Sequence, residues 1–329
     1  MRGGWTFVAR TIALTLIAGA AGAATSGWTL VDLGTLGGPG SYGAAISQGG
    51  AVVGCADRAD GTAHAFLYLN GRMRDLDAGS NGPGSSCALA VNDSGFVAGR
   101  SSSGALVIWS GSSVTSLNVA GDVGGIDSRG VVVGSYREGA STIAFRYADG
   151  ALQAIAAPDS VATGINSRGQ VVGTVDGRAF IYEGGTLRDL GTLGGARSSA
   201  KGLNDLGQVV GMSSDANSQP RAFEFDGAMR ALPGPSYAGA IGINNRGQVV
   251  GSAEGTHGYV VEGDTYTRLD TLGAVTAKGW RHMEPTGIND HGWIVGTGSN
   301  AAGELRAFLL IPGDRAPVGA VARAGRAAF

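Results

Sequence analysis

The sequence is poor in charge, cysteine and histidine. Lys, Arg, Asp and Glu make up 15% of its 329 residues, the formal net charge is -2, and there are only 2 cysteines and 4 histidines. Proteins that bind nucleic acids or anionic membranes carry concentrated positive charge. The balance found here predicts neither kind of partner.

Catalytic and metal-binding motifs are also missing from the sequence. It contains no Gly-x-Ser-x-Gly, His-Glu-x-x-His or Gly-x-x-x-x-Gly-Lys-Ser/Thr pattern. Turns such as that at Asn92 and Asp93 lack the alternating acids and distant Glu of a calcium loop. We therefore predict no metal and no cofactor, and no motif names a reaction.

The N-terminus has the pattern of a secretory signal peptide. Arg2 and Arg10 precede an uncharged, largely apolar run over residues 11–24, which holds the small residues Ala21, Gly22 and Ala23. A membrane anchor is the alternative, but it needs roughly 20 apolar residues, and this run is shorter. We expect cleavage of residues 1–23, a mature chain from Ala24, and no membrane attachment after cleavage.

What the sequence has in abundance is glycine, at 60 residues, and much of it belongs to a repeat. The repeat reads Ile or Leu, Asn, two variable residues, Gly, one more residue, and Val-Val-Gly. Successive closing glycines are 35 to 45 residues apart, about the length of one four-stranded propeller blade. The closing glycines are Gly54, Gly99, Gly134, Gly173, Gly211, Gly251 and Gly296.

Each repeat predicts four short antiparallel strands. In the clearest copy, strands are expected over residues 162–165, 170–174, 178–182 and 186–190, with turns at Asn166 to Gly169 and at Glu183 to Gly185. Adjacent valines point to opposite faces of a strand. Both faces must therefore be buried, as in a sheet packed between two neighbours.

A third-strand aromatic, such as Phe66, Phe145 or Phe180, is expected in the core between sheets. The residue two positions before it is basic in several units, as at His64, Arg178 and His257. We expect this row to pair with carboxylates such as Asp75 and Asp189. A basic ligand-binding ring is the alternative.

The seventh unit lacks a fourth strand after residue 311, and a matching segment stands at residues 28–33. An N-terminal strand that completes the last unit would remove an open sheet edge. We therefore predict an all-β, seven-bladed β-propeller over residues 24–312, with a frayed tail over residues 313–329, acting as a monomer. An open β-solenoid of the same units is the alternative.

These motifs resemble the bacterial extracellular repeat family called HAF. The resemblance rests on His64-Ala65-Phe66, on the identical heptapeptides at residues 32–38 and 189–195, and on the Asn-x-x-Gly-x-Val-Val-Gly turns, and it covers residues 28–312. It implies export and a repeat fold, with the protein secreted or periplasmic. It implies no catalytic residues.

The variable connections between strands and between units are where a binding site is expected, because loops on a rigid scaffold carry function. The longest between repeats, residues 270–285, gathers an aromatic side chain and several charged ones. An exposed indole could stack on a sugar, and the charged groups could supply hydrogen bonds. The alternative is a solvated loop whose Trp forms a lid over the central channel. The candidate ligand-binding residues are Lys278, Trp280, Arg281, His282 and Glu284.

Cys55 and Cys87 are expected near the same end of neighbouring units in an exported chain. A disulfide between them is plausible in an oxidising compartment. Two free or buried thiols are the alternative.

Two functions remain open at this point. The first is an exported binding or structural protein that recognises a carbohydrate, peptide or surface partner through the variable loops. The second is a polysaccharide hydrolase or lyase with its site at the channel mouth. Acids in the variable loops occur singly, without a paired motif, so the sequence favours binding. These acids are Asp57, Asp60, Glu138, Asp159, Asp176, Asp215, Glu254 and Glu284.

Overall fold

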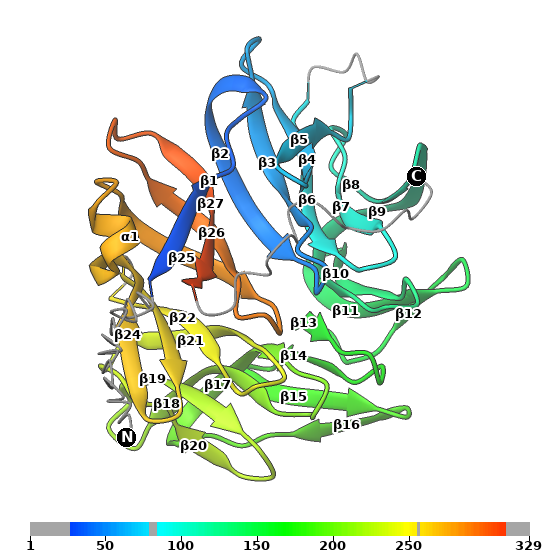
Figure 1. Cartoon of the computed structure of the whole chain (residues 1–329). Helices are drawn as coiled ribbons and strands as arrows, with labels where there is room; N and C mark the ends of the chain where they lie inside the picture. Colours follow the sequence, from blue (N-terminus) through cyan, green and yellow to red (C-terminus); the bar gives the residue numbers. More distant parts are fainter. Residues whose placement is uncertain (1–26, 79–83, 255–256, 314–329) are drawn as a thin grey trace, which may run out of the picture.

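The computed structural model describes residues 27–78, 84–254 and 257–313, which form an all-β molecule (Figure 1). The predicted signal peptide and the predicted tail from Asp314 onward lie outside the described residues. The strands form six antiparallel sheets, five with four strands and one with seven. Within each four-stranded sheet, the strands are given below in the order in which they are hydrogen-bonded to one another. Two of these sheets are β1 (Trp28–Asp32), β27 (Leu305–Pro312), β26 (Ile294–Ser299), β25 (Arg281–Ile288); and β2 (Gly37–Ile46), β3 (Val52–Arg58), β4 (Ala63–Leu69), β5 (Arg72–Asp75). The other three are β13 (Ser160–Ile165), β14 (Val171–Val175), β15 (Arg178–Glu183), β16 (Thr186–Asp189); β17 (Gly194–Leu203), β18 (Val209–Asp215), β19 (Pro220–Phe225), β20 (Met229–Ala231); and β21 (Ala238–Ile243), β22 (Val249–Ala253), β23 (His257–Glu262), β24 (Thr265–Arg268).

The seven-stranded sheet contains two repeat units that share one long strand, β9. The first half of β9 pairs with β8 as far as Ala120, and the second half pairs with β10 from Gly121 onward. One strand therefore ends one unit and begins the next. The strands of this sheet are β6 (Cys87–Val91), β7 (Phe96–Arg100), β8 (Ala105–Ser110), β9 (Ser113–Ile126), β10 (Val132–Glu138), β11 (Ser141–Ala148) and β12 (Ala151–Ala154).

The first strand of the chain completes the last sheet. β1 pairs antiparallel with β27, with Trp28 opposite Pro312 and Leu30 opposite Leu310. The next strand, β2, contacts β25, β26 and β27. The first sheet thus lies against the last, and the sheets are arranged around a common centre (Figure 1).

Within each unit the repeated apolar residues are buried as predicted. Val171 and Val172 are both fully buried on β14, although they point to opposite faces of the strand. The third-strand aromatics Phe66, Phe145 and Phe180 are likewise fully buried. The core therefore lies between successive sheets, where the second and third strands of the units are buried, while outer strands such as β16 are exposed.

The closing glycine of the repeat is required by a bulge in the first strand. The pairing of β13 with β14 shifts register between Ala162 and Gly164, next to Gly173. A Cβ added to Gly173 would collide with the carbonyl oxygen of Val161. Bulges of this kind bend a strand and increase its twist, so the glycine lets each inner strand curve around the axis.

The repeated asparagine joins neighbouring units as well as forming its own turn. The Asn166 Oδ1 accepts hydrogen bonds from the backbone N–H groups of Arg168 (3.1 Å) and Gln170 (3.0 Å). Its Nδ2 donates to the carbonyl oxygen of Asn204 in the next unit at 3.0 Å. Asn204 donates in the same way to Asn244 at 3.0 Å. Asparagine thus supplies a link that a purely local turn residue would not.

The first and second units are joined by a disulfide. Cys55 on β3 and Cys87 on β6 are bonded, with their Cα atoms 4.7 Å apart. The first unit has Ser47 in place of the repeated Asn. The disulfide therefore crosses a junction that has no asparagine side chain to bridge it.

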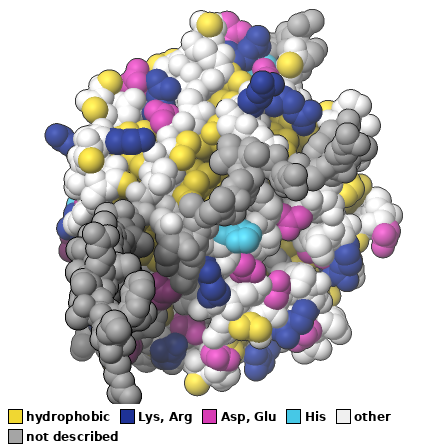
Figure 2. All heavy atoms as spheres, in the orientation of Figure 1, with side chains coloured by type: hydrophobic (Ala, Val, Ile, Leu, Met, Phe, Trp, Pro, Cys, Tyr) yellow, Lys and Arg dark blue, Asp and Glu magenta, His cyan; other side chains and the backbone are white. Residues whose placement is uncertain are grey.

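In the part of the chain that the structure describes, the two named helical segments are short and lie between the sixth and seventh units. The 3-10 helix η1 (Leu269–Thr271) and the helix α1 (Gly273–Thr276) precede β25. Among the described residues, no helix has the length and hydropathy needed to span a bilayer. On the face shown in Figure 2, basic and acidic side chains are interspersed.

Candidate functional site

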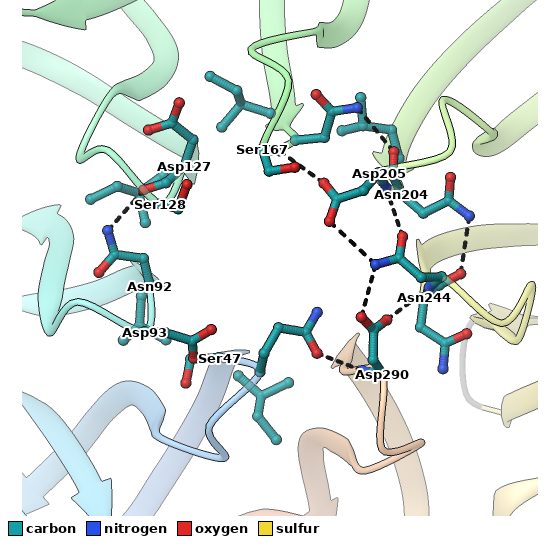
Figure 3. A pocket seen from close by; sticks show the side chains of 18 of the residues that line it. Ser47, Asn92, Asp93, Asp127, Ser128, Ser167, Asn204, Asp205, Asn244 and Asp290 are labelled. Atoms are coloured by element: carbon teal, nitrogen blue, oxygen red, sulfur yellow. Dashed lines mark hydrogen bonds between the residues drawn. The ribbon is translucent and has the colours of Figure 1, made fainter. Parts of the chain in front are cut away.

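The turns between the first and second strands of the units converge on the central axis and surround a cavity (Figure 3). Its volume is about 360 Å³. Every unit contributes the residue that follows the repeated Asn position, and all seven are polar. This set, which we call the rim, consists of Gln48, Asp93, Ser128, Ser167, Asp205, Asn245 and Asp290.

The rim is held by hydrogen bonds that run from one unit to the next. The backbone N–H of Ser167 donates to Asp205 Oδ1 (2.9 Å), and that of Asp205 donates to Asn245 Oδ1 (2.8 Å). The series continues from the N–H of Asn245 to Asp290 Oδ1 (2.8 Å) and from that of Asp290 to Gln48 Oε1 (2.7 Å). Finally, the N–H of Gly49 donates to Asp93 Oδ1 at 2.7 Å. These bonds fix the rim side chains in place before any ligand arrives.

Two rim carboxylates share one amide. The Nδ2 of Asn245 donates to Asp205 Oδ2 at 3.2 Å and to Asp290 Oδ2 at 2.8 Å. Desolvation opposes ionisation of Asp205, but hydrogen bonds from Ser167 and Asn245 and the nearby charge of Arg168 outweigh it and lower the pKa of Asp205. Asp205 is therefore an anion at neutral pH.

The charge of the rim is negative. Asp93, Asp205 and Asp290 lie on it, and the cavity lining contains no Lys or Arg. A fourth lining acid, Asp127, has a fully buried side chain that is paired with Arg129 at 2.7 Å. Among the described residues, no group of three or more His, Cys, Asp and Glu could hold a metal ion.

Below the rim lies a ring of aliphatic side chains, and the deeper wall also includes Lys201, Thr163 and Thr286. The residue before the repeated Asn position forms an aliphatic ring that lines both the rim cavity and a second cavity of about 260 Å³ deeper in the channel. The site is thus a cup with an anionic, hydrogen-bonding rim and an aliphatic ring directly below it. The ring consists of Ile46, Val91, Ile126, Ile165, Leu203, Ile243 and Ile288.

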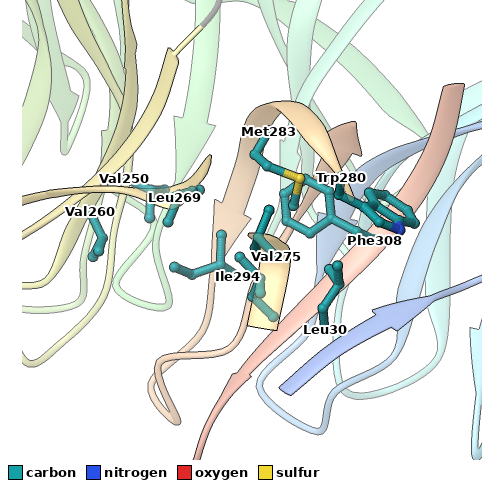
Figure 4. Close-up of a cluster of buried hydrophobic side chains, with 10 residues drawn as sticks. Leu30, Val250, Val260, Leu269, Val275, Trp280, Met283, Ile294 and Phe308 are labelled. Atoms are coloured by element: carbon teal, nitrogen blue, oxygen red, sulfur yellow. The ribbon is translucent and has the colours of Figure 1, made fainter. Parts of the chain in front are cut away.

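Trp280 does not have the exposed indole that a ligand platform requires. Its exposed fraction is 6%. The ring packs edge-on against Phe308, with centroids 6.4 Å apart, in a core that includes Leu30 and Met283 (Figure 4). The expectation of an exposed aromatic surface is therefore corrected: the tryptophan is part of the core of the last sheet, and it is also not a lid over the channel.

The other residues of the predicted loop site separate into two groups. Lys278 donates from Nζ to the carbonyl oxygen of Leu30 at 2.7 Å, so it holds β1. Arg281, His282 and Glu284 are exposed at the start of β25. The rim lies beyond the other end of this strand, whose last residue is Ile288. An eight-residue strand is roughly 26 Å long, so Arg281 and His282 are on the face opposite the rim, and Glu284 lies midway along the strand.

The row of basic residues on the third strands pairs with carboxylates, as the sequence predicted. His64 Nδ1 lies 3.0 Å from Asp75 Oδ2, and Arg178 lies 3.1 Å from Asp189. His257 contacts Asp270 at 3.2 Å in the same manner.

The sequence did not point to the rim as a site, because its residues lie in turns and the need to form those turns already explains why they are present. Asn92-Asp93-Ser94-Gly95 is fully accounted for as a turn. The one available signal was that the residue after the repeated Asn position is polar in all seven units. That pattern becomes a site only when seven turns meet at one point.

Comparisons with solved structures bear on the fold. YCF48 bound to a D1 peptide matches with a TM-score of 0.54 and 12% identity over 87% of this chain and 96% of that one. The WD40 β-propeller domain of Doa1 matches with a TM-score of 0.53 and 13% identity over 86% and 97%. A fucose-binding lectin of Aleuria aurantia, a six-bladed β-propeller, is more distant, with a TM-score of 0.36, 11% identity, and coverage of 90% and 98%. No family model and no curated protein matches the sequence. The chain is thus all-β and similar in fold to β-propellers.

Proposed function

We propose that this protein is an exported, seven-bladed β-propeller that binds a positively charged group of a peptide at the rim. The observation that carries the proposal is the cavity of about 360 Å³ whose charged lining residues are all aspartates. A cationic side chain placed there gains Coulomb attraction and hydrogen bonds from carboxylates that are already fixed. Its aliphatic part would lie against the ring that includes Ile165 and Leu203.

To obtain seven blades, the seven-stranded sheet is divided into two blades at β9. Because β9 pairs with β8 in its first half and with β10 in its second, it serves two four-stranded units. The five remaining sheets each supply one blade. On this view β1 closes the ring by pairing with β27.

A peptide is the ligand class that we favour. YCF48, which is similar in fold, has a structure with a bound peptide. Basic side chains of peptides offer the charge that the rim complements, whereas most sugars are neutral. The choice between peptide and carbohydrate thus rests on the charge of the rim.

Binding is a better proposal than glycoside hydrolysis. A glycosidase needs one carboxylic acid that stays protonated to donate to the leaving group, and its pKa is raised. The pKa of Asp205 is shifted downward instead. None of the eight loop acids proposed from the sequence lines the rim cavity.

The experiment compares two variants on one array of capped hexapeptides that carry a single Lys, Arg or Gln in a Gly/Ser background. Asp93→Asn with Asp205→Asn removes two rim charges while each amide oxygen can still accept the backbone bond. We expect binding of Lys and Arg peptides to weaken at least tenfold, since each lost charge contact is worth about 1 kcal/mol or more.

The matched control is Arg281→Ala with Glu284→Ala, two exposed side chains that do not line the rim cavity. This variant should bind like the parent. Loss of binding in the control, with the rim variant unaffected, would place the ligand on the variable loops and contradict the proposal.

The pH dependence of binding follows from Asp205. Because the pKa of Asp205 is lowered, its carboxylate is still charged at a pH of about 3.9, the ordinary pKa of an aspartate. We expect the affinity for a Lys peptide to be unchanged from pH 8 to pH 5 and to decrease only at lower pH, while circular dichroism confirms that the fold persists. A decrease already between pH 7 and pH 5 would point to a histidine and contradict this assignment.

Export is supported by the N-terminal pattern of Arg2, Arg10 and the apolar run, and by the similarity of the repeats to the HAF family, to which we propose that the chain belongs. The protein would then act in the periplasm or outside the cell. Mass spectrometry of protein exported from a bacterial host should find an N-terminus near Ala24. Full-length protein retained in the cytoplasm would reject the signal peptide.

A further inference from the structure

A further cavity, separate from the two in the channel, lies on the rim face where the last sheet meets the first. Its volume is about 330 Å³, and it is bounded by β1, β27, the end of β4 and the turns before β3 and β26. The aliphatic and aromatic side chains that line it are Val31, Tyr68, His291, Trp293, Leu309 and Ile311. We call this cavity the seam groove.

The seam groove depends on a substitution in the seventh repeat. Trp293 occupies the position that is Gln170, Gln208 or Gln248 in other units. In those units the glutamine accepts a hydrogen bond from the repeated asparagine, at 2.7 Å in the case of Gln170 and Asn166. An indole cannot accept that bond.

Trp293 is instead half-buried beside Gly50, where a Cβ would lie 2.6 Å from its Cζ3 atom. The backbone of Gly50 has φ +83°, which also favours glycine. Glycine in the neighbouring turn thus leaves room for an aromatic ring, and the ring forms one wall of the groove.

The seam groove is continuous with the rim. Gln48 lines both cavities, and its Oε1 accepts the backbone N–H of Asp290 at 2.7 Å. His291, the next residue, lines the groove. A ligand anchored at Asp290 can therefore extend over Gln48 into the groove without leaving the surface.

We propose that the seam groove receives an aliphatic or aromatic side chain of the same peptide whose basic side chain enters the rim. This inference rests on the proposed function and adds a second specificity element to it. The anionic rim complements a cation, and the walls formed by Val31, Leu309 and Ile311 offer apolar contact. A carbohydrate would leave most of its hydroxyl groups unpaired against those walls.

The test uses capped hexapeptides that pair one Lys with one Leu or Phe at separations of one to four residues, with Gly in place of the apolar residue as reference. At the best separation, the apolar residue should increase affinity about tenfold in the parent protein. Trp293→Gln introduces the residue found in three other repeats, at Gln170, Gln208 and Gln248, so the variant should fold, as its melting temperature will show. It should lose the tenfold increase and still bind the reference peptide like the parent.

A second variant, Tyr68→Ser, removes another wall of the groove and should have the same effect if Trp293→Gln does not fold. The inference is overturned if the apolar residue adds nothing in the parent, if the increase survives both variants, or if neutral oligosaccharides compete with the apolar residue for the groove. Failure of the proposed function looks different: no Lys peptide binds, or Asp93→Asn with Asp205→Asn leaves binding unchanged.

Discussion

Trp280→Ala should lower the free energy of unfolding by about 3–5 kcal/mol, the usual cost of truncating a large buried aromatic side chain. Trp280 is 6% exposed and packs against Phe308, Leu30 and Met283. Removing the indole leaves a cavity between β1 and the segment that contains α1. Urea denaturation followed by circular dichroism measures the effect.

Arg281→Ala is the control for this measurement, since its side chain is exposed and adjacent in the sequence. It should change stability by no more than about 0.5 kcal/mol. If Trp280→Ala instead unfolded at the parent's urea concentration and lost peptide binding, the indole would belong to a ligand site, and the interpretation of the core would be wrong.

Deleting residues 28–33 should have a still larger effect. The deletion removes Leu30 and Leu33, which are 1% and 4% exposed. It also unpairs the edge of β27, because β1 is the neighbour of that strand. Two buried leucines alone account for about 4–10 kcal/mol, which is comparable with the whole stability of a typical domain.

We therefore expect the truncated protein to melt far below the parent and to aggregate through the exposed strand edge. Thermal melts with light scattering report both effects. Leu30→Ala is the milder variant for comparison. It should lower the free energy of unfolding by about 2–5 kcal/mol while β1 still pairs with the edge of β27. A truncated chain that melts like the parent would show that β1 does not close the ring.

The sequence predicted the units well because their pattern is repeated and local. The strands expected over residues 162–165 and 178–182 are found as β13 (Ser160–Ile165) and β15 (Arg178–Glu183). The burial of both Val171 and Val172 followed from strand geometry alone. The sequence did not predict the sharing of β9, because Asn118 and Gly121 are residues typical of a turn between units, whereas the chain passes through them as a single strand in which Asn118 has φ +55°.

The candidate site was less predictable, for two physical reasons. A segment with one aromatic residue among charged neighbours has the same composition whether the aromatic ring faces solvent or the core. The sequence around Trp280 therefore gave no indication that its side chain is buried. Asp205 and Asp290, in contrast, are 85 residues apart in the sequence. They meet at Asn245 because the three consecutive units that carry these residues lie side by side with their turns at the same end.

A crystal structure of the protein with the tightest-binding Lys hexapeptide would test the central claim, that the rim is the ligand-binding site, most directly. We predict the lysine ammonium group within hydrogen-bond distance of the carboxylate of Asp93, Asp205 or Asp290, with its aliphatic chain against the ring that includes Ile165 and Leu203. A peptide bound instead beside Arg281 and His282 on the opposite face would contradict it.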